Sequence, residues 1–70
     1  MKGKVKFFEP KKGYGFITPE SEEMTKDVFV HYSEIEPGKD GFKTLDKDQK
    51  VAFDVVNGER GFIAKNVMKL

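Results

Sequence analysis

Hydrophobic and polar residues alternate in short runs along this chain, and turn-forming residues separate the runs. An alternation of period two is typical of a strand that packs one face against a core. No stretch of useful length has the spacing of an amphipathic helix. The pattern predicts five strands, at residues 4–8, 14–18, 27–32, 50–56 and 62–69.

Proline, glycine and polar residues mark the connections between these strands. Pro10 has no amide proton to give to a ladder, so residues 9–13 are predicted to form a turn. Asn57 followed by Gly58 is a strong hairpin signal before the last strand. Short antiparallel strands must hide their edges, and closing into a small barrel achieves this. The fold class we expect is therefore all-β, a five-stranded antiparallel barrel. The remaining connections are a polar loop at residues 20–26, a single helical turn at 33–35 and a long polar segment at 36–48.

Small and aliphatic side chains are expected to form the core. Val28 and Val30 share one face of their strand and are β-branched, which suits a packed sheet. Phe8 is undecided between the core and the edge of the opposite face. The full set expected to point inward is Ile17, Val28, Val30, Ile35, Leu45, Val51, Phe53, Val55, Ala64, Val67 and Met68.

A second face of the barrel is predicted to be aromatic. Tyr14 and Phe16 share one side of their strand, and Phe29 and His31 share one side of the next. If the two strands pair, these rings form one face, and a monomer rarely exposes such a patch without a use for it. Lys12 comes just before the first pair. Exposed rings beside a cation suit a nucleic-acid base and its phosphate.

Net charge says little about partners, but the distribution of charge says more. The chain has 70 residues, which we interpret as one domain over residues 1–70, and a formal net charge of +1. Residues 1–17 hold five lysines and a single acidic residue, Glu9, whereas residues 20–23 hold three glutamates. The basic strip therefore coincides with the aromatic stretch, which favours phosphate binding there.

Several classes of function lack the residues they need. The sequence has no cysteine, which excludes disulfides and thiolate metal sites and is compatible with a reducing compartment. No apolar run is long enough to cross a membrane and no secretory signal is visible, so we expect a cytoplasmic protein. His31 is the only histidine, and no serine nucleophile is placed to pair with it. We therefore expect no catalytic residue, no metal and no cofactor.

Five segments of the chain, in the same order, resemble the cold-shock protein family. They are residues 3–8 (GKVKFF), 12–17 (KGYGFI), 27–32 (DVFVHY), 41–45 (GFKTL) and 64–67 (AKNV). The second and third are similar to the family's RNP1 and RNP2 motifs. Together the segments span nearly the whole chain, which makes the match highly specific.

This resemblance implies an OB-fold barrel that binds single-stranded RNA and DNA. We expect no membrane partner, and we expect the protein to be a monomer. The resemblance also implies an RNA-chaperone role, in which RNA is kept single-stranded during cold adaptation or growth. Lys12 and Arg60 would meet phosphates or base edges. The residues that would stack bases are Phe7, Phe16, Phe29, His31, Tyr32 and Phe42. The nucleic-acid-binding residues implied are Lys6, Phe7, Lys12, Tyr14, Phe16, Asp27, Phe29, His31, Tyr32, Phe42 and Arg60.

The chain departs from the family pattern at several positions. Phe7 replaces a usual tryptophan, Glu9 a common asparagine, and Lys65 a usual alanine. Residues 62–63, Phe-Ile, replace a usual Pro-Gln pair, and we interpret Phe62 as a packing residue. Strict alternation also puts Lys6 and Phe7 on opposite faces, so a bulge or a strong bend is needed for both to bind.

Other functions remain open at this point. An RNA-recognition motif fits residues 12–16, but that fold needs two packed helices that the sequence does not predict. A different OB-fold RNA binder of the translation machinery would use similar chemistry. A barrel that binds a protein or peptide through its aromatic face is a third alternative, and an enzyme is disfavoured because no catalytic set is evident.

Overall fold

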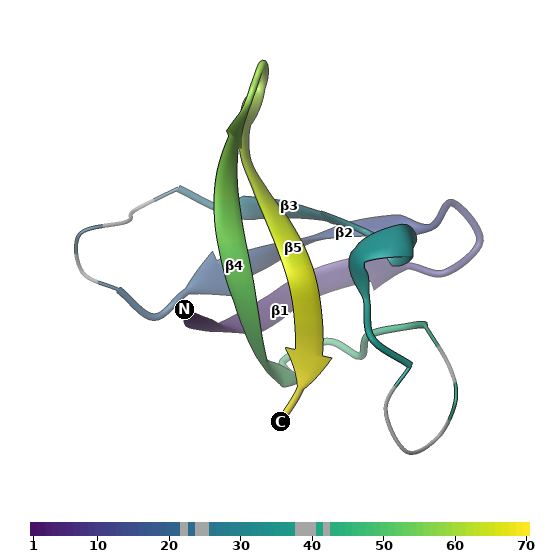
Figure 1. The fold of residues 1–70 in the computed structure, drawn as a ribbon. Coiled ribbons are helices and arrows are strands. Elements are labelled where there is room, and N and C mark those ends of the chain that lie inside the picture. The colour runs from purple at the N-terminus through teal and green to yellow at the C-terminus, as the bar shows by residue number, and fades with distance from the viewer. Residues whose placement is uncertain (22, 24–25, 38–40, 42) are drawn as a thin grey trace.

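The computed structural model describes residues 1–21, 23, 26–37, 41 and 43–70. Its strands close into a barrel in the order β1-β2-β3-β5-β4 (Figure 1), which confirms the expected five-stranded, all-β architecture. In the described part of the chain, no helix has the length and apolarity needed to cross a membrane. The elements are β1 Lys2–Glu9, β2 Tyr14–Pro19, β3 Val28–His31, the 3-10 turn η1 Tyr32–Glu34, β4 Lys50–Gly58 and β5 Gly61–Lys69.

One seam of the barrel is parallel. Strands β1 and β2, β2 and β3, β1 and β4, and β4 and β5 pair antiparallel, as the alternation predicts. Strands β3 and β5 pair in parallel, with Phe29 opposite Ile63. A parallel seam requires a long crossover between its strands, and the chain from η1 through β4 provides it. The expectation of a fully antiparallel barrel is therefore wrong at this seam alone.

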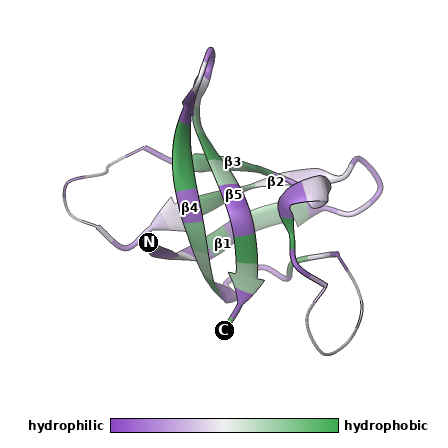
Figure 2. Cartoon of the chain, in the orientation of Figure 1, coloured by the Kyte–Doolittle hydropathy of each residue, from purple (hydrophilic) through white to green (hydrophobic). Residues whose placement is uncertain are grey.

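The core lies inside the barrel and consists almost entirely of the expected residues. In Figure 2, hydrophobic and hydrophilic segments alternate along β4 and β5. Val55 and Phe8 are partly buried and pack against the core, so Phe8 belongs with the packing side. The buried hydrophobic residues are Val5, Ile17, Val28, Val30, Ile35, Leu45, Val51, Phe53, Ala64 and Val67.

Met68 is the one expected core residue that the structure places outside. Its side chain is 56% exposed. Ladder pairs on β4 advance from Ala52 to Asp54 while those on β5 step back from Met68 to Lys65, so β5 carries an extra residue. Asn66 adopts a positive φ of 53° within this irregularity. The bulge resets the alternation, so Val67 points inward and Met68 outward.

Candidate nucleic-acid interface

Four rings lie side by side on the outer face of β1, β2 and β3. We call Phe7, Tyr14, Phe16 and Phe29 the aromatic row. Phe16 is the ladder partner of both Phe7 and Phe29, and its ring centroid lies 5.6 Å and 5.7 Å from theirs. Tyr14 stacks on Phe29 at 5.9 Å with an interplanar angle of 22°. These distances suit favourable aromatic pairs, and the row leaves part of each ring exposed.

The division of faces confirms the alternation argument. Gly15 and Ile17, the neighbours of Phe16 along β2, are both buried. A Cβ at Gly15 would collide with the carbonyl oxygen of Phe7 on β1. The glycine between the two rings therefore lets the strands approach closely, which brings the ring of Phe7 against that of Phe16.

A β-bulge in β1 turns Lys6 and Phe7 to the same side. Val5 pairs with Ile17 and Phe7 with Phe16, so two steps on β1 match one step on β2. Lys6 is the extra residue, and both it and Phe7 are exposed, Phe7 at 40%. The structure thus provides the bulge that the use of both residues requires.

Lys6 forms an ion pair at the edge of the aromatic row. Its Nζ donates to Oδ2 of Asp27 at 2.9 Å, and the Thr18 hydroxyl donates to Oδ1 of the same carboxylate at 3.3 Å. The side chains of Lys6 and Asp27 are 59% and 34% exposed, and such a pair contributes only about 0–1 kcal/mol. Lys6 can therefore exchange this carboxylate for a phosphate at little cost in stability.

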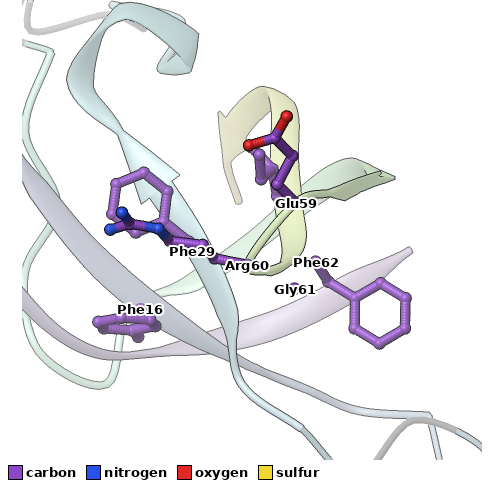
Figure 3. A pocket seen from close by; sticks show the side chains of 7 residues that line it. Phe16, Phe29, Glu59, Arg60, Gly61 and Phe62 are labelled. Carbon is purple, nitrogen blue, oxygen red and sulfur yellow. The ribbon is translucent and has the colours of Figure 1, made fainter.

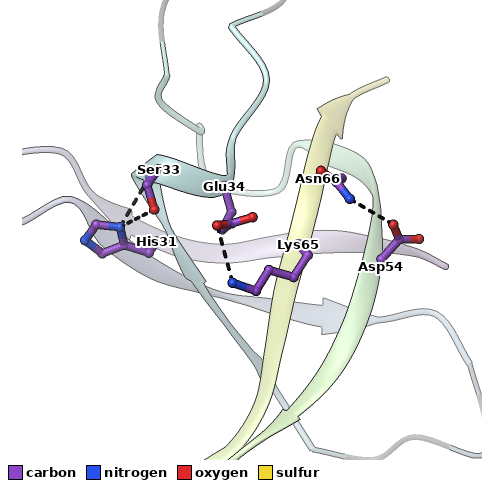
Figure 4. A network of polar contacts seen from close by, with 6 residues as sticks. All are labelled: His31, Ser33, Glu34, Asp54, Lys65 and Asn66. Atoms are coloured by element: carbon purple, nitrogen blue, oxygen red, sulfur yellow. Dashed lines mark hydrogen bonds and ion pairs between the residues drawn. The ribbon is translucent and has the colours of Figure 1, made fainter.

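His31 continues the aromatic face from Tyr14, its ladder partner. Its Nδ1 accepts the backbone N–H of Ser33 at 3.3 Å and lies 2.9 Å from the Ser33 hydroxyl (Figure 4). The expectation that no serine lies within reach of His31 is therefore wrong. A ring nitrogen that accepts a hydrogen bond carries no proton, so the neutral ring holds its proton on Nε2. His31 therefore presents an N–H donor on the side away from Ser33, which suits a base carbonyl or a phosphate oxygen.

A second interaction in Figure 4 holds this end of the face in place. Lys65 Nζ on β5 donates to Glu34 in η1 at 3.4 Å. The backbone of Ile35 pairs with that of Val67 in an isolated parallel bridge, and Ile35 is 2% exposed. Lys65, which departs from the family pattern, thus helps to fasten the turn that follows His31.

The β1–β2 turn places Lys12 beside Tyr32. The amides of Lys12 and Gly13 both donate to the carbonyl of Glu9, at 3.1 Å and 2.7 Å. Gly13 has a φ of 78°, and a Cβ there would lie 2.7 Å from the Tyr32 ring, so glycine is required on both counts. The Tyr32 ring also packs near His31, at a centroid distance of 4.7 Å. An open hollow of about 230 Å³ borders Lys12, Tyr32 and Lys43.

Arg60 approaches the aromatic row from the β4–β5 turn. It lines a hollow of about 550 Å³ together with Phe16 and Phe29, and Figure 3 shows its guanidinium directed toward these rings. The structure therefore gathers Arg60 and the residues of β1, β2 and β3 on one side of the barrel. Phe42, the last of the implied binding residues, lies outside the described residues.

Sequence reasoning did not predict that residues 62 and 63 border this hollow. Phe62 and Ile63 line it, and Val56, the ladder partner of Ile63, is 42% exposed. The interpretation of Phe62 as a packing residue is confirmed in part, because its ring packs against the core as well. Because Ala64 was expected to point inward, alternation could have placed its neighbour Ile63 on the outer face. Only the parallel seam, however, brings Ile63 next to Phe29.

The barrel and its outer face define a class of protein before any comparison. A small closed barrel with exposed rings and flanking cations is typical of OB-fold proteins that bind nucleic acids. No group of three or more His, Cys, Asp or Glu side chains placed to hold a metal ion occurs among the described residues.

Comparisons with known proteins identify the family. The model of the 'Cold-shock' DNA-binding domain family matches residues 1–70. The chain is 51% identical to "Cold shock-like protein CspE" of Escherichia coli (strain K12) over 70 residues, which is all of this chain and 96% of that protein. It is 50% identical to "Cold shock-like protein CspC" of Bacillus cereus over 70 residues, covering 100% of both. The chain belongs to the cold-shock domain family, as its five sequence segments indicated.

Proposed function

We propose that this protein binds single-stranded RNA and DNA with little sequence preference and acts as an RNA chaperone of the cold-shock type. The observation that carries the proposal is the aromatic row, whose rings are partly exposed and in mutual contact on the outer face of the barrel. Its membership of a nucleic-acid-binding family supports the same conclusion.

Base stacking supplies the affinity in this proposal. Each base that stacks on a protein ring contributes about 1–3 kcal/mol, and every base has a face that can stack. Single strands are favoured over duplexes because only unstacked bases can lie on the rings. Phe7, Phe16 and Phe29 would each take a base, with His31 and Tyr32 extending the stacking surface at the β3 end. The described rings fit this role by position, and Phe42 keeps the role that the resemblance implies.

Lysine and arginine side chains would hold the strand's phosphates. Lys6 and Lys12 flank the aromatic row on β1 and in the β1–β2 turn, and Arg60 lies on the β5 side. Asp27 would accept a hydrogen bond from a base once Lys6 leaves it for a phosphate. Cations at both ends of the row would fix the strand's path without reading its sequence.

An RNA-chaperone role follows from binding that is selective for unpaired strands. Any ligand that binds only the open form of a hairpin shifts the equilibrium toward that form by mass action. We infer that the protein does this without catalytic chemistry, as a monomeric single domain in the cytoplasm. The lack of cysteine is compatible with that compartment.

Fluorescence anisotropy of a labelled oligo-dT or oligo-U strand at two salt concentrations tests the proposal. A strand of about six to eight nucleotides lies within the range of OB-fold site sizes. If Lys6, Lys12 and Arg60 each neutralise one phosphate, log K should fall with log salt at a slope of about −2. A hairpin with the same loop sequence should bind more weakly than the linear strand. Absence of binding at low salt would contradict the proposal and favour a protein or peptide as the partner.

A further inference from the structure

Three lysines line a hollow at the β1–β2 turn that the proposed function uses only in part. The hollow has a volume of about 230 Å³, and its cationic lining is Lys11, Lys12 and Lys43. All three residues are exposed, and no carboxylate of the described residues lines the hollow. None of the three forms an ion pair with a described carboxylate. The hollow is therefore a concentration of positive charge without a counter-charge.

The backbone around this hollow is fixed by the fold. The amide of Tyr32 donates to the carbonyl of Gly13 at 2.8 Å, which ties the β1–β2 turn to η1 (Figure 1). On the other side, Leu45 is 3% exposed and anchors the segment that carries Lys43 and Thr44. Thr44 is half-buried and adds a hydroxyl group to the lining. The hollow is thus shaped before any ligand enters it.

The hollow lies at one end of the stacking surface. Tyr32 lines it, and the Tyr32 ring lies against His31 at a centroid distance of 4.7 Å. His31 is in turn the ladder partner of Tyr14 in the aromatic row. A strand that stacks along these rings therefore passes from the row across His31 and Tyr32 to the three lysines. A phosphate group that ends the strand at this point would lie among cations.

We propose that this hollow binds the terminal phosphomonoester of a single strand, so that the protein prefers strands with a phosphorylated end. The inference rests on the proposed function, because the bases of the same strand occupy the rings. A phosphomonoester carries a charge of about −1.5 to −2 at neutral pH and has three acceptor oxygens. Each phosphate inside a strand carries a single negative charge. Lysine ammonium groups bind phosphate as point charges with several donors each, which suits the more highly charged end.

Charge favours the end of a strand over its interior at this hollow. Three ammonium groups in one hollow repel one another, and a dianion offsets more of this repulsion than a monoanion does. Exposed ion pairs contribute modestly, so the extra charge on the terminal phosphate should raise the affinity about fivefold at low salt. Hydrolysis of a phosphodiester leaves a phosphomonoester on one of the two new ends. The preference would therefore direct the protein to strands that have been cleaved.

Competition titrations with three unlabelled oligo-dT strands of about seven nucleotides test this site. The strands carry a 5′-phosphate, a 3′-phosphate or a hydroxyl group at both ends. Each displaces the same labelled strand, so that no dye occupies the end under test. At low salt, one of the two phosphorylated strands should bind about fivefold more tightly than the hydroxyl strand. The other should gain clearly less, because its phosphate lies at the far end of the rings.

Two variants and a control assign the gain to the hollow. Lys11→Gln and Lys43→Gln each remove one charge and keep a polar side chain. Each should reduce the gain from the terminal phosphate to about twofold, and the double variant should abolish it. Lys47→Gln is the matched control, because Lys47 is also exposed and follows in the same connection but lines a different hollow. It should keep the full gain.

The outcomes separate this inference from the proposed function. Tight binding of all three strands with no gain from either phosphate would overturn the terminal-phosphate site alone. Equal gains from the two ends, or a gain that persists in the double variant, would also overturn the site, because a generally basic surface would then explain the effect. No binding of any of the three strands to the unmodified protein would overturn the proposed function and the terminal-phosphate site together.

Discussion

Replacing Phe16 or Phe29 by alanine should weaken single-strand binding by about 1–3 kcal/mol, which is about a fivefold to 150-fold increase in Kd. Each variant removes one ring on which a base stacks. Because these rings lie on the outer face and are only partly buried, Tm should fall by less than about 8 °C, the effect of roughly 1 kcal/mol in a domain of this size. Anisotropy titrations and thermal melts of the same samples measure both quantities.

Met68→Ala is the matched control for this pair, because it also truncates an exposed apolar side chain. It lies off the aromatic row and should change neither Kd nor Tm measurably. If Phe16→Ala and Phe29→Ala instead unfold the domain, the rings belong to the core and the assignment of faces is wrong. The double variant should deviate from additivity, since the two rings are in contact at 5.7 Å.

Replacing Phe53 by alanine should have the opposite consequence and abolish stable folding. Phe53 is 3% exposed in the centre of the core, and truncation of a buried phenylalanine costs about 3–5 kcal/mol. A core in a chain of this length rarely supplies more than about that amount. Circular dichroism at 25 °C should show a largely unfolded protein.

Val56→Ala is the control on the same strand, because its side chain is 42% exposed and surface changes cost about 0.5 kcal/mol or less. If Phe53→Ala melts cooperatively with the same Tm as the unmodified protein, the ring is not needed to fill the barrel. Comparison of Phe53→Ala with Phe29→Ala therefore distinguishes a ring that stabilises the fold from a ring that is proposed to bind nucleic acid.

Strict alternation was enough to divide the faces of β2 and β3. Val28 and Val30 are both fully buried, and Phe16 and Phe29 are ladder partners on the outside. Period-two patterns carry this information because a strand with one buried face allows no other arrangement. The core and the centre of the candidate interface could therefore be predicted from local sequence.

Bulges and the parallel seam lay beyond the reach of local patterns. An extra residue changes the parity of all that follows, which is why Met68 was misplaced after the irregularity at Asn66. In β1, alternation alone put Lys6 and Phe7 on opposite faces. Only the family resemblance, which uses both residues, pointed to the bulge that the structure contains. The contact between Phe29 and Ile63 joins segments far apart in the chain, so no short pattern could place Ile63 beside the interface.

Phe7 provides a smaller stacking surface than the tryptophan that is usual in the family. The bulge compensates in part by leaving the ring 40% exposed and in contact with Phe16 at 5.6 Å. On the opposite side of the row, Ile63 and Val56 add apolar surface at the parallel seam. The apolar surface of this face of the barrel is thus smaller at β1 and larger at β5 and β4.

Aromatic ¹H–¹³C NMR spectra recorded during titration with an oligo-dT strand at low salt test most directly whether bases stack on the aromatic row. Stacked bases should shift the ring signals of Phe7, Phe16 and Phe29 progressively until the strand saturates the protein. The ring signals of Phe53, inside the barrel, should stay in place. Saturating binding that leaves the three outer rings unshifted would contradict stacking on this face.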